Sequence, residues 1–442
     1  MRRRGVTMLS MAVLLGLVLL SGVAVAGSTP VKMWVLGAVK DEDVAYMDAA
    51  VAKFRAQSGL DVTYEFVGWG DAFQKISTAI AAGEGPDVTQ VGTTWVATFQ
   101  ATGGFADLTE YVGKEIPSAD AFTPGAWATT GYGGKVYSVP WFSDIRAMMY
   151  RTDLWGEAGY PEGPQTWDEF REGAKKIKDA HPELDSVIGL QGQGVAHWVG
   201  SFIWQNCGEF FSEDGTTATW NDPKNIEAMQ WWTDMLVKDG TISKMTSEWG
   251  FVEPITRFWD GKVALILLGS PHISLGTTPE QIEKMQDKVG ITPEPAGKNG
   301  CRHGFVGGSN VMLFEHSTNK ENALKWMAFL LQPEIQELRA QVRHEGPVIK
   351  AAYDLPTFKQ WWWPHFFEAA QNGRHFPVHP AWGEMESLMG KWKTEIYTSV
   401  IDGTYTDTTV KEIGEAINAE AQEKIDLVGA PENYHVPWPQ PK

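Results

Sequence analysis

Apolar and polar positions along the chain follow two different periods, and each switch between them marks the change from a strand to a helix. Residues 60–67 alternate as expected for a strand with one buried face, whereas apolar side chains in 41–58 recur at helical spacing up to Gly59. The first third of the chain is therefore predicted to contain strands at 31–36, 60–67 and 87–91 and helices at 41–58 and 72–82.

A second run of alternating elements begins near Tyr137. Thr166 stands three residues before Glu169 in the pattern of a capping box, and Asp222 followed by Pro223 is typical of a helix start. Strands are predicted at 263–268 and 305–314, and helices at 319–331, 364–370, 385–397 and 408–427, with Pro333 ending the first of these helices.

Strands that alternate with helices predict an α/β fold with a mostly parallel sheet covered by helices. Ligands of such sheets bind at the carboxyl ends of the strands, so the loops after Leu36, Val67 and Val91 are candidate binding loops. The last two of these loops carry Trp69, Asp71, Thr93, Thr94 and Trp95. Asp71 and Thr94 fit a purely structural role as helix caps equally well.

The first 26 residues have the pattern of a secretion signal. Arg2, Arg3 and Arg4 precede an apolar stretch, and small residues at 24–26 predict cleavage after Ala26. A retained membrane helix is the alternative, but the apolar stretch is short for a span of ~20 residues. No Cys lies near the cleavage position, so we expect a protein in the periplasm or extracytoplasmic space without a lipid anchor.

Charge and cysteine content narrow the classes of partner. The formal charge is −18 at pH 7, and removal of the predicted signal with its three Arg makes it −21. So acidic a surface argues against binding to nucleic acid or anionic membranes. Cys207 and Cys301 are too few for a disulfide framework, and the sequence leaves open whether they form one bond or stay as buried thiols.

Tryptophan is unusually abundant, with 21 in the chain. Flat indole rings match the apolar C–H face of a sugar ring and leave its hydroxyls to polar partners. Any single Trp fits a place in the core, but the excess as a whole favours a protein that binds sugars.

Several short motifs, in a fixed order along the chain, resemble those of the extracellular solute-binding proteins of carbohydrate ABC importers, the group of the maltose- and trehalose-binding proteins. They are AAGEGPDV at 81–88, TWVA at 94–97, GGFADLT at 103–109, GKVYSVPW at 134–141, YRTDL at 150–154, FWDGKVA at 258–264, FVGGSN at 305–310 and FLLQPE at 329–334. Each motif alone is weak, and the ordered set is specific.

The resemblance implies a two-lobed, type II periplasmic-binding-protein fold with crossings between the lobes near 139–144 and 303–308. The N-terminal lobe would comprise 30–140 and 304–352, and the C-terminal lobe 141–303 and 353–442. The expected function is to bind a neutral mono- or oligosaccharide in the cleft between the lobes and deliver it to a membrane permease. We expect a monomer that needs no cofactor or metal and is not an enzyme.

The resemblance also implies ligand contacts. Asp144 follows the first crossing in a stretch similar to one where relatives place a ligand-binding carboxylate, and its alternative role is that of a structural partner to Arg146. The other expected contacts are Trp69, Asp71, Thr94, Trp95, Phe142, Arg146, Trp204, Gln205, Trp249, Glu253, Gly308, Ser309, Arg374 and Trp382. Core packing accounts for Trp204 and Gln205 equally well.

One motif departs from the family pattern. Relatives often carry Gly-Pro-Trp after the apolar strand, with the Trp stacked on the sugar, whereas residues 269–272 here are Gly-Ser-Pro-His. Either His272 takes the place of the stacking ring, or another Trp supplies it.

Three rival functions are compatible with parts of the sequence. A secreted glycoside hydrolase would share the signal and the Trp excess. It would also need two catalytic carboxylates, and no segment of the sequence indicates such a pair. A metal-transport protein could use His365, His375 and His379, although Pro377 interrupts the last pair. A binding protein for a polyol or a glycerol-phosphate-type solute is the nearest alternative, since relatives of this kind also exist.

Overall fold

The computed structural model describes residues 29–37, 39–194, 197–270, 273, 276–432 and 434. The predicted secretion signal and His272 lie outside these described residues. Among the residues described, no helix has both the length and the apolar character needed to cross a membrane.

The centre of the protein is a mixed sheet of eight strands in the order β2-β1-β3-β8-β4-β6-β5, with β7 also paired to β4. The strands are β1 (Val31–Leu36), β2 (Val62–Val67), β3 (Val88–Gly92), β4 (Ser138–Arg151), β5 (Ser186–Gly189), β6 (Val263–Gly269), β7 (Val289–Thr292) and β8 (Val306–Leu313). The predicted strands are all present. The sheet is not mostly parallel, however, because β4 and β8 run antiparallel to their neighbours.

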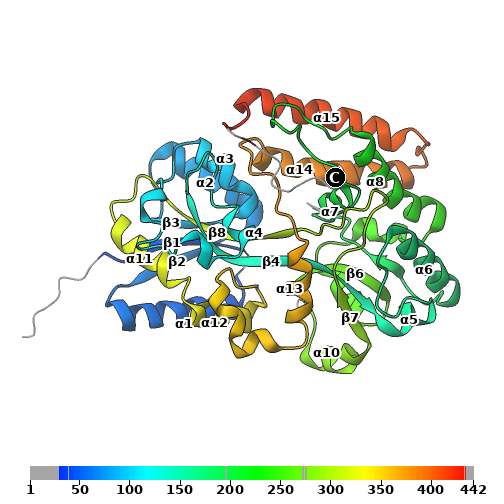
Figure 1. Cartoon of the computed structure of the whole chain (residues 1–442), viewed down its shortest axis with the longest axis horizontal. Coiled ribbons are helices and arrows are strands. Elements are labelled where there is room, and N and C mark those ends of the chain that lie inside the picture. The colour runs from blue at the N-terminus through cyan, green and yellow to red at the C-terminus, as the bar shows by residue number, and fades with distance from the viewer. Residues whose placement is uncertain are drawn as a thin grey trace, which may run out of the picture.

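Strands β4 and β8 join two bodies of the molecule. Figure 1 shows β4 running from the sheet of β1, β2 and β3 across the middle to β6 and β7. One hydrophobic core packs β1 and β3 with α1 (Asp41–Ser58) and α11 (Lys320–Phe329). A larger, aromatic core packs α6 (Trp167–Ala180), α8 (Pro223–Asp234) and the C-terminal helices. We call these the first core and the second core.

Helices cover both bodies. The remaining ones are α2 (Trp69–Ala82), α3 (Val96–Ala101), α4 (Pro124–Trp127), α5 (Thr152–Glu157), α7 (Trp198–Gln205), α9 (Glu253–Trp259), α10 (Pro279–Met285), α12 (Pro333–Arg343), α13 (Trp363–Gln371), α14 (Trp382–Ile401) and α15 (Thr409–Val428). The helix before Pro333, α11, ends at Phe329, two residues earlier than the predicted 331, and Pro333 itself begins α12, because proline fits the first turn of a helix.

The predicted helix starts are only partly as expected. The Thr166 hydroxyl accepts the backbone N–H of Glu169, but the Glu169 carboxylate accepts from Gln165 and not from Thr166, so the capping box is half formed. Asp222 caps α8 by accepting the N–H of Lys224. Asp71 is not a cap, because α2 begins two residues before it, after Gly68.

Cys207 and Cys301 form a disulfide with their Cα atoms 5.3 Å apart. Both residues are buried. The bond ties the end of α7 to the segment that leads into β8, which settles the alternative between one bond and two thiols. Disulfides persist in oxidising compartments, so this bond agrees with a place outside the cytoplasm.

Candidate functional site

The carboxylate of Glu386, in the first turns of α14, bonds side chains from both bodies. Its Oε2 accepts from the Thr94 hydroxyl at 3.0 Å and from the Trp95 indole N–H at 3.1 Å. Its Oε1 accepts from His197 Nε2, beside α7, at 2.9 Å. Thr94 and Trp95 follow β3, whereas α7 and α14 belong to the second core. One carboxylate, 12% exposed, therefore connects the two bodies.

A second contact supports this bridge. The Thr98 hydroxyl in α3 donates to the Pro380 carbonyl at 2.7 Å and accepts from the Gly383 N–H at 3.0 Å. The start of α14 is therefore fixed against η1 (Thr93–Trp95) and α3 by backbone as well as side-chain bonds.

A hollow lies beside this bridge at the carboxyl ends of β5 and β6. Its walls are formed by Arg146, Gly189, Leu190, Gln191, His197, Trp198, Ser201, Phe251, Pro254, Ile255, Ile266, Leu267, Leu268 and Glu294. Strand ends are where open α/β sheets bind ligands. The loops after Leu36, Val67 and Val91, which the sequence indicated, contribute no residue to these walls. The walls combine apolar and aromatic surface with a few polar groups, but the volume of about 30 Å³ is far below the usual range of small-molecule sites.

Two acidic groups and one basic group set the electrostatics of the hollow. Arg146 Nη2 donates to Asp144 Oδ2 at 2.7 Å, and each side chain is 14% exposed. Glu294 is buried, and its oxygens accept from Gln205 Nε2 at 2.6 Å and Ser201 Oγ at 3.3 Å. Burial raises the pKa of the Glu294 carboxyl to about 7, against the opposing effect of Ser201, Arg146 and Gln205.

Among the predicted residues, Thr94 and Trp95 bond the Glu386 carboxylate, and Asp144 pairs with Arg146, which lines the hollow. Trp69 is 44% exposed and packs edge-to-face on Trp95, with ring centroids 5.4 Å apart. Gly308 and Ser309 lie in β8, where the Gly308 position approaches the Phe142 carbonyl so closely that a Cβ would meet it at 2.0 Å. Both residues therefore serve to pair β8 with β4 at the crossing.

Other predicted contacts lie in the interior. Trp204 and Trp382 are fully buried and pack on Phe376. Gln205 is bonded to Trp167 and Glu294, directly behind the hollow. Arg374 is buried in a two-point pair with Glu209 at 2.8 and 2.9 Å.

Four predicted positions lie elsewhere. The Phe142 ring is covered by the Arg339 guanidinium, 4.1 Å from its centroid, and the buried Trp249 ring lies under Arg257. Glu253 is exposed at the start of α9. Asp71 lines a separate depression with Trp34 and Lys75.

Sequence reasoning missed Glu386, His197, Glu294 and Ser201. Glu386 sits inside a correctly predicted helix, and His197 lies 189 positions away along the chain, so no local pattern connects them. Glu294 follows a short strand that was not predicted. The sequence feature that could have indicated Glu294 is its position as a carboxylate just after an apolar segment.

Two of the three histidines of the metal-site alternative have other partners. His375 Nδ1 bonds the Phe376 carbonyl at 2.7 Å, and His379 bonds the Gly215 carbonyl and the Ala381 N–H. Burial lowers the pKa of each to about 4. Within the described ranges, no three His, Cys, Asp or Glu side chains are grouped as metal ligands.

The two bodies, the crossing strands and the cleft define a two-lobed binding protein. The chain belongs to the bacterial extracellular solute-binding protein family, whose model matches residues 37–337. It is 28% identical to the diacetylchitobiose binding protein DasA of Streptomyces coelicolor, with 88% of each chain covered. The sugar-binding protein MalE of Xanthomonas citri is 25% identical, with a TM-score of 0.77 and coverage of 90% of this chain and 99% of that one.

The GacH receptor of Streptomyces glaucescens has the same fold, with a TM-score of 0.76 at 21% identity and coverage of 90% of this chain and 98% of that one. These similarities confirm the predicted family and the two-lobed, type II periplasmic-binding-protein fold. Members of the family are binding proteins.

Glu386→Gln tests the bridge, because it keeps the side-chain shape and removes the charge. We expect the free energy of unfolding to fall by about 1.5–3 kcal/mol, the typical contribution of a hydrogen bond to a charged group. Backbone amides of 93–98 should exchange faster with deuterium. Glu384→Gln, an exposed position on the same helix, is the matched control. Equal effects of the two variants would contradict a bridging role.

Glu294 should make stability depend on pH. Its pKa of about 7 lies above the ordinary 4.5, so its favourable contribution is complete below pH 4.5 and is lost as pH rises through 7. The free energy of unfolding can be measured by chemical denaturation at pH 5 and pH 8. Relative to the wild type, Glu294→Gln should be more stable at pH 8 than at pH 5 by up to about 3 kcal/mol. A constant difference between the two proteins at both pH values would rule out this titration.

Proposed function

We propose that the chain is the sugar-binding component of an ABC importer. It binds a neutral mono- or oligosaccharide between its two lobes and delivers it to the permease subunits in the membrane. The observation that carries this proposal is the Glu386 bridge beside a partly aromatic hollow, in a chain of the solute-binding family. The named relatives that bind diacetylchitobiose and maltotriose support a sugar as the ligand class.

The mechanism follows from contacts that exist only when the lobes meet. A ligand that touches both lobes stabilises the closed arrangement through its differential contacts in that state. Charged groups such as Asp144, Arg146 and Glu386 form the stronger hydrogen bonds to sugar hydroxyls, and they disfavour ligands that lack the matching hydroxyl. Trp69 and Trp95 supply flat apolar surface for the face of a sugar ring.

The lobes are proposed to be 30–140 with 304–352, and 141–303 with 353–442. The separate first and second cores and the crossing of β4 and β8 support this partition. Ser143 and Gly346 exchange two backbone hydrogen bonds of 2.8 Å where a further segment joins the crossing. The lobes can therefore rotate about a small number of paired strands.

The site is proposed to comprise Trp69, Thr94, Trp95, Asp144 and Arg146 from the sequence, joined by His197, Ser201, Glu294 and Glu386 from the structure. The protein acts as a carrier without catalysis, as a monomer, and without metal, cofactor or nucleic acid. The Cys207–Cys301 disulfide and the family support a location outside the cytoplasm, reached through a cleaved signal.

Calorimetry on the mature protein tests the proposal against a panel of mono-, di- and trisaccharides, ribitol and glycerol phosphate. We expect saturable binding of a neutral sugar that is unchanged by a chelator. At a hundredfold excess of ligand over Kd, stability should rise by about 2.7 kcal/mol. Loss of binding in the chelator, a preference for the polyol or the phosphate, or release of reducing sugar would each refute it.

A further inference from the structure

A groove on the outer side of the second core lies between α6, α8 and the start of α15. Its lining includes the indole of Trp231, which stacks on Trp167, also a lining residue, with ring centroids 4.2 Å apart and planes 11° from parallel. Trp167 is buried, whereas Trp231 is only half-buried. One face of Trp231 is therefore covered by Trp167, and the ring contributes flat aromatic surface to the groove.

This aromatic pair is held rigidly. Trp167 Nε1 donates to Gln205 Oε1 at 2.8 Å, and Gln205 continues to the buried Glu294. Phe202 meets Trp231 edge-to-face at 5.4 Å. The Trp231 indole N–H, by contrast, makes no hydrogen bond to any other described residue. A preformed ring with a free donor lowers the ordering cost of binding.

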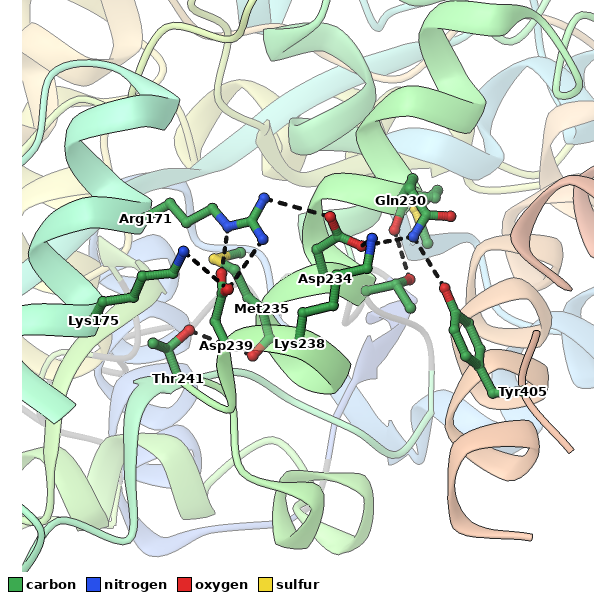
Figure 2. Close-up of polar contacts among 11 residues, drawn as sticks. Arg171, Lys175, Gln230, Asp234, Met235, Lys238, Asp239, Thr241 and Tyr405 are labelled. Carbon is green, nitrogen blue, oxygen red and sulfur yellow. Dashed lines mark hydrogen bonds and ion pairs between the residues drawn. The ribbon is translucent and has the colours of Figure 1, made fainter. Parts of the chain in front are cut away.

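The rim carries polar groups that are fixed in place. Figure 2 shows Arg171 reaching Asp239 and Asp234, and Gln230 reaching Asp234 and Tyr405. The Gln230 amide donates to Asp234 at 2.8 Å and to the Tyr405 hydroxyl at 3.0 Å. Hydrogen-bonding atoms at set positions around an aromatic surface suit a ligand with hydroxyls around an apolar face.

The charges on the groove select against an ionic ligand. The lining contains equal numbers of cationic and anionic side chains, namely Arg171, Lys298 and Lys411 against Glu227, Asp234 and Asp407. Such a balance attracts neither a phosphate nor a cation over distance, so it favours a neutral ligand.

We propose that this groove is a second binding site, for a neutral oligosaccharide. It shares no lining residue with the hollow beside Glu386. The site therefore goes beyond capture in the cleft, and it gives the protein an outward-facing contact with saccharide while the cleft is closed.

Calorimetry with malto-, cello- and chito-tetraose on the full mature protein tests the second site. The wild type should show a class of weaker sites besides any cleft binding. Trp231→Ala should weaken this class by about tenfold or more, as truncation of a central aromatic contact does. Trp361→Ala, which removes a half-buried indole outside the groove, should leave both classes unchanged.

Asn221→Ala keeps the test decisive if Trp231→Ala lowers stability. Asn221 lines the groove and is exposed, and its amide makes no hydrogen bond to another described residue, so its loss should not affect folding. We expect a severalfold loss of affinity at the weaker class. A wild type with no second class, or a second class indifferent to both variants, would overturn the proposal. Failure of the proposed cleft function would give a different result. The tighter class of binding, which Trp231→Ala should leave unchanged, would then be absent.

Discussion

Two cores that share strands must be held in one relative position, and the Glu386 carboxylate does this at the cleft. It accepts hydrogen bonds from Thr94 and Trp95 on one side and from His197 on the other. Because these partners come from different bodies, the bonds exist together only when the bodies meet. A ligand in the adjacent hollow would add its own contacts to the same arrangement, so ligand binding and closure of the two bodies would stabilise each other.

The crossing is braced from behind as well. The guanidinium of Arg339 lies 3.9 Å from the centroid of the Trp141 ring and 4.1 Å from that of Phe142, both in β4. Arg339 also pairs with the buried Glu345, next to the Gly346 that bonds Ser143. Cation–π contacts and a buried ion pair thus fix the strand from which Asp144 and Arg146 reach the cleft.

Much of the fold could be predicted, because periodicity and helix-end signals are local. The pattern placed β1, β2, β3, β6 and β8 and the long helices within a few residues. The antiparallel course of β4 and β8 could not be read from periodicity, since it depends on how the bodies pack. The same holds for the Cys207–Cys301 bond, whose partners are separated by 94 positions.

The site was predicted less well, for a related reason. The residues after β3 were found because strand ends are recognisable, whereas Glu386 and His197 meet only through tertiary packing. The Trp excess arises in part from the cores, where each single Trp was already given a place as an alternative. Within the described part of the chain, nine Trp side chains are fully buried, so aromatic packing of the cores accounts for much of the excess.

Small-angle scattering of the mature protein, with and without its saturating sugar, tests most directly whether the ligand closes two lobes. We expect a smaller radius of gyration with ligand, and a smaller change for Glu386→Gln than for Glu384→Gln, because the former substitution weakens the bridge. An unchanged radius of gyration in the wild type at saturation would contradict ligand-driven closure.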